Sequence, residues 1–249
     1  MPPLTFLGNE NLLEIISEKQ IKISLLNDQE FACSFTSIMH YQEWTRYFTM
    51  LDKPIYTNLV KEFWKHAYLD YENGSISSYV FEVPITITPF LITLATGCEN
   101  VGVTIDIVKS RFTMSEKFAP LHDLSLGYDP INPENLLPTP KAWFKLIVSN
   151  FLPRGENQDI LRYDDQAFIY LLMNDIRVNL PQSIFNCLWK SISESRNQAK
   201  SYIPYGRVLS EIFFKEGIVD ILKERITEDG HENSPENCLL KTKCEVFSG

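Results

Sequence analysis

The sequence lacks any long apolar run. Its longest one, from Phe90 to Ala95, is short and is interrupted by Thr93. A membrane-spanning helix needs about 20 apolar residues, so we expect no membrane span. The first residues, Met1 to Glu10, also lack the basic and apolar regions of a secretory signal. These two absences predict an intracellular protein, in the cytoplasm or the nucleus.

Cysteines are few and scattered. There are 5, at Cys33, Cys98, Cys187, Cys238 and Cys244. An odd, widely spaced set does not form the framework of a disulfide-stabilised secreted domain. The last two cysteines and His231 match no zinc-binding spacing, and a fourth ligand is missing near them. We therefore expect no metal ion and no cofactor.

The sequence also lacks an excess of positive charge. It has 23 Lys and Arg against 32 Asp and Glu, which gives a net charge of −9. Domains that bind nucleic-acid phosphates are usually basic, so this balance disfavours nucleic acid as a partner. With 16 Phe, 11 Tyr and 4 Trp, the 249 residues carry enough large apolar side chains to bury a sizeable core.

Common catalytic motifs are missing as well: there is no P-loop, GxGxxG, HExxH, GxSxG or paired CxxC. The densest carboxylate set is Asp164, Asp165 and Asp175. Asp164 and Asp165 are adjacent at an expected helix start, so their side chains diverge by roughly 100°. They suit the positive end of the helix dipole. We expect no enzyme and no catalytic residue, and a metal-dependent nuclease or transposase is the least favoured alternative.

The 4 histidines do not change this expectation. They are His40, His66, His122 and His231, and they lie far apart in the sequence. None accompanies a Ser or Cys nucleophile in a recognisable motif.

One mildly basic cluster favours a different alternative. Lys190, Arg196, Lys200 and Arg207 are interleaved with Tyr202 and Tyr205, and Glu194 lies among them. Basic and aromatic side chains together can bind single-stranded nucleic acid by charge and stacking. The overall negative charge favours a solvated connection between two helices instead. A nucleic-acid-binding module of a mobile element stays the alternative function.

The spacing of apolar residues predicts helices over most of the chain. Expected helices cover residues 10–19, 40–51, 56–69, 88–96, 104–112, 139–151, 163–176, 180–192, 204–216 and 218–226. Residues 21–39 are expected to be extended or irregular, and 76–86 alternate as one strand. The predicted fold is mainly α-helical, with a small β element around residues 76–87 in the N-terminal half.

Composition divides the chain into four parts. Residues 1–112 form a helical part with the short strand, and the proline-rich 113–140 form a connector. Residues 141–227 form a second helical part packed on the first, so that one domain results. Residues 228–249 begin with an acidic stretch too polar to pack and are expected to be a disordered tail.

Four segments in a fixed order carry a resemblance to a known family. They are Leu59–Trp64, Lys141–Ile147, Val178–Pro181 and Ile203–Leu222, the last reading IPYGRVLSEIFFKEGIVDIL. Over roughly residues 40–226 the chain resembles the family called the putative plant transposon protein domain. Its members are often labelled envelope-like proteins of plant long-terminal-repeat retrotransposons. The resemblance implies an origin in a mobile element and carries over no site residue.

The functional prediction follows from these points. We expect a non-catalytic, envelope-like, retrotransposon-derived protein that acts as a protein-interaction module, binding an unknown protein or itself. An envelope role implies a signal peptide and a membrane anchor, and this sequence departs from both expectations. The helices from Pro204 to Leu222, with Phe213 and Phe214, are a candidate contact surface unless they are buried in the core.

Overall fold

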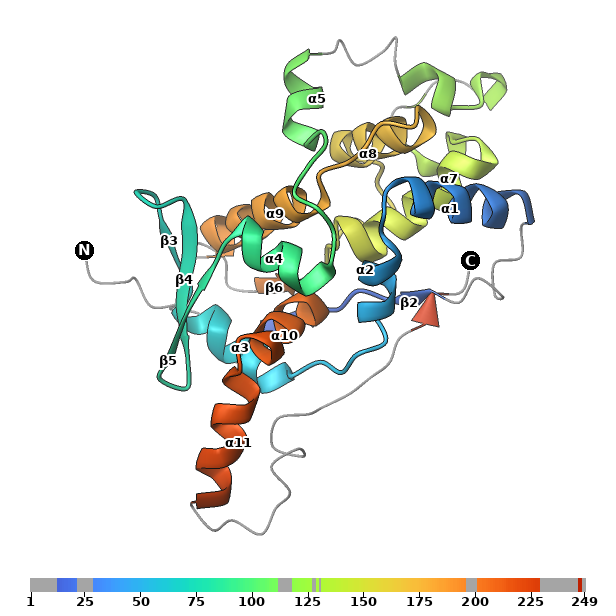
Figure 1. Cartoon of the computed structure of the whole chain (residues 1–249). Helices are drawn as coiled ribbons and strands as arrows, with labels where there is room; N and C mark the ends of the chain where they lie inside the picture. Colours follow the sequence, from blue (N-terminus) through green and yellow to red (C-terminus); the bar gives the residue numbers. More distant parts are fainter. Residues whose placement is uncertain are drawn as a thin grey trace.

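Helices form most of the described chain, which comprises residues 13–21, 29–111, 118–126, 129, 131–195, 201–228 and 246–247 of a computed structural model (Figure 1). The α-helices are α1 (Gln29–Tyr41), α2 (Thr45–Met50), α3 (Thr57–His66), α4 (Pro89–Thr96), α5 (Ile105–Arg111), α7 (Pro138–Leu146), α8 (Tyr163–Met173), α9 (Leu180–Ser195), α10 (Gly206–Lys215) and α11 (Ile218–Glu228). A π-helical segment, η6 (Ile147–Phe151), directly follows α7. The prediction of a mainly α-helical fold is confirmed.

Strands are short and form small sheets. β3 (Tyr68–Asp70), β4 (Ser75–Val80) and β5 (Val83–Ile87) make an antiparallel sheet in the order β3-β4-β5. The β element expected around residues 76–87 is therefore present, but it is a hairpin and not one strand. Phe81 and Glu82 form its turn with φ angles of 46° and 67°. Neither is a residue that usually marks such a turn, so the break was invisible in the sequence.

Two other strands correct the predicted helix boundaries. β1 (Leu13–Ile16) pairs in parallel with β6 (Ser201–Pro204), with Leu13 opposite Ser201 and Ile16 opposite Pro204. The expected helix over 10–19 is thus wrong for its described part, because a distant strand supplies the hydrogen bonds. The helix expected from Pro204 begins at Gly206 instead. A second short parallel pair joins β2 (Gln20–Ile21) to β7 (Val246–Phe247).

The expectation that residues 21–39 are extended or irregular is also wrong in part, since α1 covers residues 29–41. The single helix expected over 40–51 is divided. The chain turns at Glu43, which has a φ of 60°, and α2 starts only at Thr45. Local pattern missed this turn because no Gly or Pro accompanies it.

The start and the end of α4 and the break at Gly217 were predicted correctly from standard residues. Thr88 accepts a hydrogen bond from the Leu91 N–H, Pro89 opens α4, and Gly97 ends it in the left-handed conformation with a φ of 70°. Gly217, with a φ of 72°, likewise separates α10 from α11. Side-chain caps and left-handed glycines are local effects, which explains why the sequence reveals them.

The segment expected to be a connector contains ordered turns where it is described. Three 3-10 turns occur there: η3 (Ala119–Leu121), η4 (Leu124–Leu126) and η5 (Pro133–Asn135). Helix α7 already begins at Pro138, with Leu137 before it, so the start expected at Thr139-Pro140 is slightly late. Most of the expected acidic tail, residues 229–245 and 248–249, lies outside the described chain.

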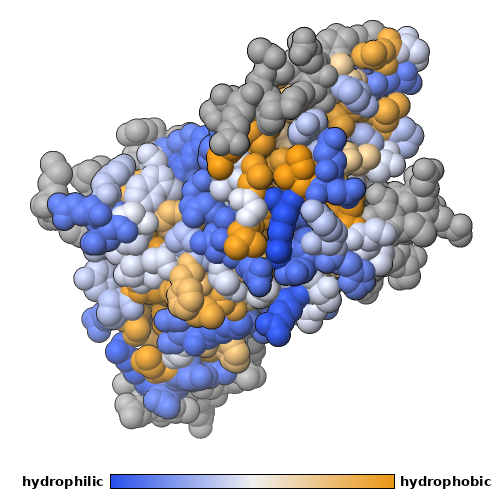
Figure 2. All heavy atoms as spheres, turned by 45° about the horizontal axis from the view of Figure 1, so that its top comes forward, coloured by the Kyte–Doolittle hydropathy of each residue, from blue (hydrophilic) through white to orange (hydrophobic). Residues whose placement is uncertain are grey.

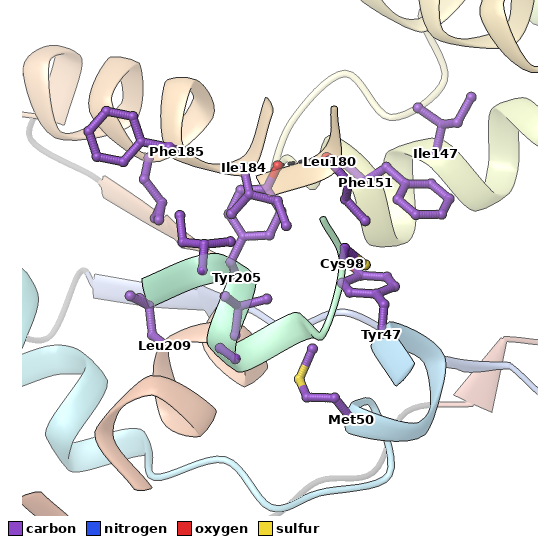
Figure 3. Packing of buried hydrophobic residues seen from close by; sticks show 14 of the residues in the cluster. Tyr47, Met50, Cys98, Ile147, Phe151, Leu180, Ile184, Phe185, Tyr205 and Leu209 are labelled. Carbon is purple, nitrogen blue, oxygen red and sulfur yellow. Dashed lines mark hydrogen bonds between the residues drawn. The ribbon is translucent and has the colours of Figure 1, made fainter. Parts of the chain in front are cut away.

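Helices α4, α9 and α10 form the centre of the core. α4 contacts both α9 and α10, and α10 also packs on α3 and α11. Every residue of α10 from Gly206 to Phe213 is buried. Figure 3 shows side chains from these helices meeting those of α2 and η6, with Tyr205 and Tyr47 pointing toward Phe151.

Residues from distant parts of the chain donate hydrogen bonds to the π-helical segment η6. The Tyr205 hydroxyl donates to the Phe151 carbonyl at 2.6 Å, the dashed line of Figure 3. The Tyr47 hydroxyl donates to the Asn150 carbonyl at 2.7 Å, and the Lys19 N–H donates to Asn150 Oδ1 at 2.7 Å. These bonds satisfy polar groups that burial would otherwise leave costly.

The aromatic residues expected in the core are there. The Trp44 and Phe151 ring centroids are 4.7 Å apart, and Phe151 stacks on Phe168 at 5.2 Å. Trp143 is fully buried, and Trp189 is partly buried against the same core. The large aromatic content of the sequence therefore serves packing.

Candidate functional site

A cleft of about 520 Å³ lies beside helix α9 and opens to solvent. One wall is α9 itself. The other comprises the loop after η6, the first turn of α8, and the edge of β6, with α5 contributing at one end. Its lining residues are Ile16, Ile105, Asp106, Leu152, Pro153, Arg154, Gly155, Glu156, Asn157, Arg162, Asp164, Asp165, Ser183, Asn186, Cys187, Lys190, Ser191, Glu194, Ser195, Tyr202 and Pro204.

The α9 wall carries a regular row of small side chains. Ser183, Cys187, Ser191 and Ser195 recur every four residues, and all of them line the cleft. Residues four apart share one face of a helix. The neighbouring face, with Ile184, Leu188 and Ile192, supplies buried apolar residues that hold α9 in the core. A row of small side chains lets another chain approach the helix closely.

An ion pair builds the opposite wall. Arg154 donates to both carboxylate oxygens of Asp165, with Nη1–Oδ1 at 2.8 Å and Nη2–Oδ2 at 2.9 Å. The Asp165 carboxylate is fully buried, and it also accepts a 2.8 Å hydrogen bond from the Arg162 N–H. Burial raises the pKa of Asp165 above its ordinary value, and the Arg154 guanidinium opposes that rise. The positive charge of Arg154 therefore compensates the buried negative charge of Asp165, and the pair has a structural role.

Arg154 also shapes the loop that follows. Its Nη2 donates to the Ile160 carbonyl at 2.7 Å, and its Nε donates to the Asn157 carbonyl at 3.1 Å. Bonds to two carbonyls and a carboxylate fix the course of residues 154–162 along the cleft. The guanidinium also lies 5.9 Å from the centre of the Phe144 ring.

Tyr202 closes one side of the cleft against this loop. A Cβ added at Gly155 would lie 2.1 Å from Cδ1 of the Tyr202 ring, so any larger residue there would force the ring to move. The Tyr202 hydroxyl donates to Glu156 Oε1 at 3.0 Å. The ring is thus held by a close backbone contact on one side and by a carboxylate at its tip.

The charges around the cleft are predominantly negative. The acidic lining residues are Asp106, Glu156, Asp164, Asp165 and Glu194, and the basic ones are Arg154, Arg162 and Lys190. The ion pair described above cancels one charge of each sign, which leaves more acids than bases. Lys190 lies 3.9 Å from Glu194, and both side chains are largely exposed. Such an exposed pair is weak.

The predicted carboxylate set does not converge. Asp164 and Asp165 lie in the first turn of α8, while Asp175 follows the other end of that helix. The eight helical steps from Asp165 to the end of α8 at Met173 already span about 12 Å. Among the described residues, no three His, Cys, Asp or Glu side chains are close enough together to hold a metal ion.

The predicted basic cluster is dispersed. Lys190 lines the cleft, but Arg207 is only 2% exposed and Tyr205 is fully buried. The interpretation of these two residues as part of a solvated connection is therefore wrong. Arg196 and Lys200 lie outside the described chain. Of the tyrosines, only Tyr202 lines the cleft.

Arg207 belongs to a buried polar network with Glu18. The Glu18 carboxylate accepts hydrogen bonds from the backbone N–H groups of Arg207 and Val208, at 2.9 and 3.1 Å. Arg207 donates in turn from Nε to the Glu18 carbonyl at 2.8 Å and from Nη1 to the Lys53 carbonyl at 2.5 Å. Burial raises the pKa of Glu18, which its hydrogen bonds oppose. The Tyr205-Gly206-Arg207 part of the segment Ile203–Leu222, which carries the family resemblance, therefore has a structural role.

The described histidines and cysteines form no reactive set. His122 is buried, and its Nε2 lies 3.3 Å from Gln166 Oε1. Cys98 and Cys187 are free, and burial raises the pKa of Cys98 to about 12 and also raises the pKa of Cys187. Neither thiol is thus activated as a thiolate nucleophile. His231, Cys238 and Cys244 lie outside the described chain, as does the side chain of Cys33.

The candidate contact surface on α10 and α11 is mostly buried. Phe213 and Leu222 belong to the core, whereas Phe214 is 47% exposed. Lys53 Nζ lies 5.9 Å from the centre of the Phe214 ring. Figure 2 shows that hydrophobic side chains on the face it presents gather in separate patches between hydrophilic ones. The central part of α10 therefore offers little surface to a partner.

Sequence reasoning missed the cleft but not all of its residues. It named Asp164, Asp165, Lys190, Glu194 and Tyr202, although for other reasons. It overlooked Arg154 and Gly155, whose roles depend on residues in other segments. The four-residue spacing of small side chains on α9 was a signal that the sequence did contain.

The chain is mainly helical, and most of the residues that line its cleft are polar or charged. Residues 40–219 match the model of the family described as Putative plant retrotransposon-related domain. The chain belongs to this family and is a retrotransposon-related protein, which confirms the resemblance to a plant mobile-element family. No curated protein and no solved structure matches the chain.

None of the helices in the described residues has the length and apolar character to cross a bilayer.

Proposed function

We propose that this chain is a non-catalytic protein-interaction module of a retrotransposon-related protein, and that its α9 cleft binds a segment of another polypeptide. The observation that carries this proposal is the cleft beside the row of small side chains from Ser183 to Ser195. These twelve helical steps span about 18 Å. A groove of that length suits an extended chain or a helix.

The lining chemistry favours a polypeptide over a small metabolite. Small-molecule sites usually enclose their ligand and are mostly apolar. This cleft opens to solvent and is lined largely by polar and charged side chains. The Ser183 and Ser195 hydroxyls donate to the Asn179 and Ile192 carbonyls, and each hydroxyl oxygen can still accept a hydrogen bond from a peptide N–H.

The state of the polar groups supports a non-catalytic role. Asp165 is fully engaged by Arg154 and by the Arg162 N–H. The raised pKa of Cys187 keeps its thiol protonated at neutral pH. A general base or nucleophile would need a poised pKa and a nearby partner.

Blocking the cleft tests the proposal. Ser191→Trp places a large ring in the cleft, and Ser37→Trp places the same ring on an exposed face of α1 as the matched control. A photo-crosslinking residue at Asn186 should form crosslinks to a second polypeptide in native extracts. Ser191→Trp should abolish these crosslinks, and Ser37→Trp should retain them, with circular dichroism confirming that both variants fold.

Two results would contradict the proposal. One is the absence of crosslinks to any polypeptide, including a second copy of the chain. The other is divalent-metal-dependent strand cleavage by the purified chain, which would establish the nuclease alternative. Binding of single-stranded nucleic acid with a steep salt dependence would favour the nucleic-acid-binding alternative instead.

The envelope-like role and the intracellular location stay predictions from the sequence. The chemistry of the cleft bears on neither of them.

A further inference from the structure

We infer that Asn73 is a site of spontaneous deamidation, and that Asp70 restrains this reaction while the chain is folded. Asn73 and Gly74 are exposed residues of the turn between β3 and β4, in the sheet at one side of the molecule (Figure 1). They are the one Asn-Gly pair in the sequence. Neither is among the residues that line the α9 cleft, so the inference is independent of the proposed function.

The reaction needs only the chain and water. The Gly74 backbone nitrogen attacks Cγ of Asn73, a new N–Cγ bond closes a succinimide ring, and Nδ2 leaves as ammonia with the proton that the Gly74 nitrogen gives up. Water then opens the ring. Cleavage of the N–Cγ bond yields aspartate, whereas cleavage of the bond from this nitrogen to the main-chain carbonyl carbon yields isoaspartate, whose main chain runs through Cγ. The net change is one water consumed and one ammonia released.

Gly74 leaves the attacking nitrogen open. Its φ of 59° is in the left-handed region, which glycine adopts without steric cost, and an Asn-Gly pair is a standard turn sequence. A Cβ built at this position would meet nothing within 4 Å, so the surroundings of the turn are also open. The residue that suits the turn is therefore also the residue that hinders ring closure least.

Asp70 holds the reacting side chain. Asn73 Nδ2 donates to Asp70 Oδ2 at 2.7 Å, and the backbone N–H groups of Glu72 and Asn73 both donate to Asp70 Oδ1 at 3.1 Å. Ring closure has to release Nδ2, so it breaks the bond to Oδ2. The folded turn therefore slows the reaction. It does not prevent it, because the turn is exposed to water.

Deamidation replaces a hydrogen-bond donor of this turn by a negative charge. The Asn73 side chain lowers the pKa of Asp70 by donating to its carboxylate, and both products lose that bond. A second carboxylate at residue 73 repels Asp70 instead. Tyr71 of the same turn packs on Trp189 of α9, with ring centroids 5.3 Å apart and ring planes at 89°. The modification therefore weakens a contact between the hairpin and α9.

Mass spectrometry of the full chain tests the inference. The folded chain is incubated at mildly alkaline pH, which favours loss of the Gly74 amide proton, and is then digested. The measured quantity is the fraction of Asn73 whose side-chain amide has become a carboxyl group. Asn174 is the internal control, because it is exposed and its Nδ2 also donates a hydrogen bond, but Asp175 follows it in place of a glycine. We expect Asn73 to convert severalfold faster than Asn174.

Substitution of Asp70 tests the restraint. Asp70→Ala should accelerate conversion of Asn73 severalfold, toward the rate of the wild-type chain unfolded in urea. Asp123→Ala is the matched control, because the Asp123 carboxylate also accepts a backbone N–H two residues further on, in a different turn. This variant should leave the rate at Asn73 unchanged. Circular dichroism confirms that both variants fold.

Two results would overturn the inference. Equal conversion of Asn73 and Asn174 in the folded chain would remove the assignment of the site. Equal rates at Asn73 in the wild type and in Asp70→Ala would remove the role of Asp70. Hydrogen exchange then measures the consequence: amides of Ser75–Val80 should exchange faster in the converted chain than in the unconverted one. Unchanged exchange would contradict the predicted weakening of the hairpin.

Discussion

Glu18 and Arg207 are joined by reciprocal hydrogen bonds although 189 residues separate them in the sequence. The Glu18 carboxylate receives the Arg207 N–H, and the Arg207 side chain returns a bond to the Glu18 carbonyl. The same carboxylate receives the Val208 N–H, so it caps the N-terminus of α10 from another part of the chain. A carboxylate there satisfies otherwise unpaired N–H groups and interacts favourably with the helix dipole.

Removing Glu18 should therefore destabilise the fold strongly. Glu18→Ala leaves the buried N–H groups of Arg207 and Val208 without their acceptor, and we expect the free energy of unfolding to fall by about 1–3 kcal/mol for each. Urea denaturation measures this change. Glu216→Ala, at an exposed position, should shift the free energy by less than about 0.5 kcal/mol. Equal effects of the two substitutions would show that the network does not stabilise the fold.

Glu18 should also impose a pH dependence on stability. Burial raises its pKa above the ordinary 4.5, so the folded chain binds this proton more tightly than the unfolded chain does. The contribution is fully present below the unfolded pKa and is lost as pH rises through the raised folded pKa. Glu18→Gln cannot titrate. The unfolding free energy of the wild type minus that of the variant should thus decrease as the pH rises above the ordinary pKa of 4.5, and an increase would refute the assignment.

The Arg154–Asp165 pair should be structural. Asp165→Ala removes the partner of a largely buried guanidinium, and we expect a loss of about 3–5 kcal/mol in urea denaturation. Asp165→Asn keeps the shape and part of the hydrogen bonding, so its effect should be clearly smaller. The exposed Asp159→Asn serves as the control. If Asp165→Ala left stability unchanged while removing an activity, a catalytic role would have to replace the structural one.

Gly155 and Tyr202 should behave as a coupled pair. Gly155→Ala forces the Tyr202 ring away from its position, and such overpacking typically costs about 1–3 kcal/mol. In a Tyr202→Ala background the added methyl group meets no ring, so Gly155→Ala should cost much less there. A double-mutant cycle measures this coupling. Strictly additive effects would mean that the contact with the ring does not limit residue 155.

The hairpin turn at Phe81 and Glu82 offers a stabilising change. Both residues are in the left-handed region, which costs roughly 1–2 kcal/mol for a residue with a Cβ. Phe81→Asn with Glu82→Gly installs the turn pair that favours this geometry. We expect a gain of about 1 kcal/mol and a melting temperature about 2–4 °C higher. The bond from Arg225 Nη1 to the carbonyl of residue 81 is retained, because it involves only the backbone. A lower melting temperature would contradict this reading of the turn.

The sequence predicted those elements whose causes are local. Thr88 and Gly97 delimit α4 through a side-chain cap and a left-handed glycine, and both effects act within a few residues. The apolar face of α9 follows from the same kind of pattern. By contrast, Leu13–Ile16 have an amphipathic helical pattern yet form a strand, because β6 supplies their hydrogen bonds. A long-range pairing overrides a local preference.

The cleft could not be predicted from local sequence patterns for the same reason. Its walls come from several segments, and its chemistry depends on which charges are cancelled. From the sequence alone, Asp165 is a candidate metal ligand. In the structure, the Arg154 guanidinium, eleven residues earlier, binds both of its carboxylate oxygens. From the sequence alone, Arg207 is a surface base. In the structure, its backbone N–H donates to the Glu18 carboxylate. The small residues of α9 were visible, but nothing local shows that they face a groove.

The parallel pairing of β1 with β6 has a consequence for biosynthesis. β1 is made at the start of the described chain, but its partner is made only after α9. Contacts between residues so far apart bear a large loop-closure cost and slow folding. During translation the β1 strand therefore has no partner until α9 and then β6 have been synthesised. This parallel pair forms late in the synthesis of the described chain, when only α10 and α11 of its helices remain to be made.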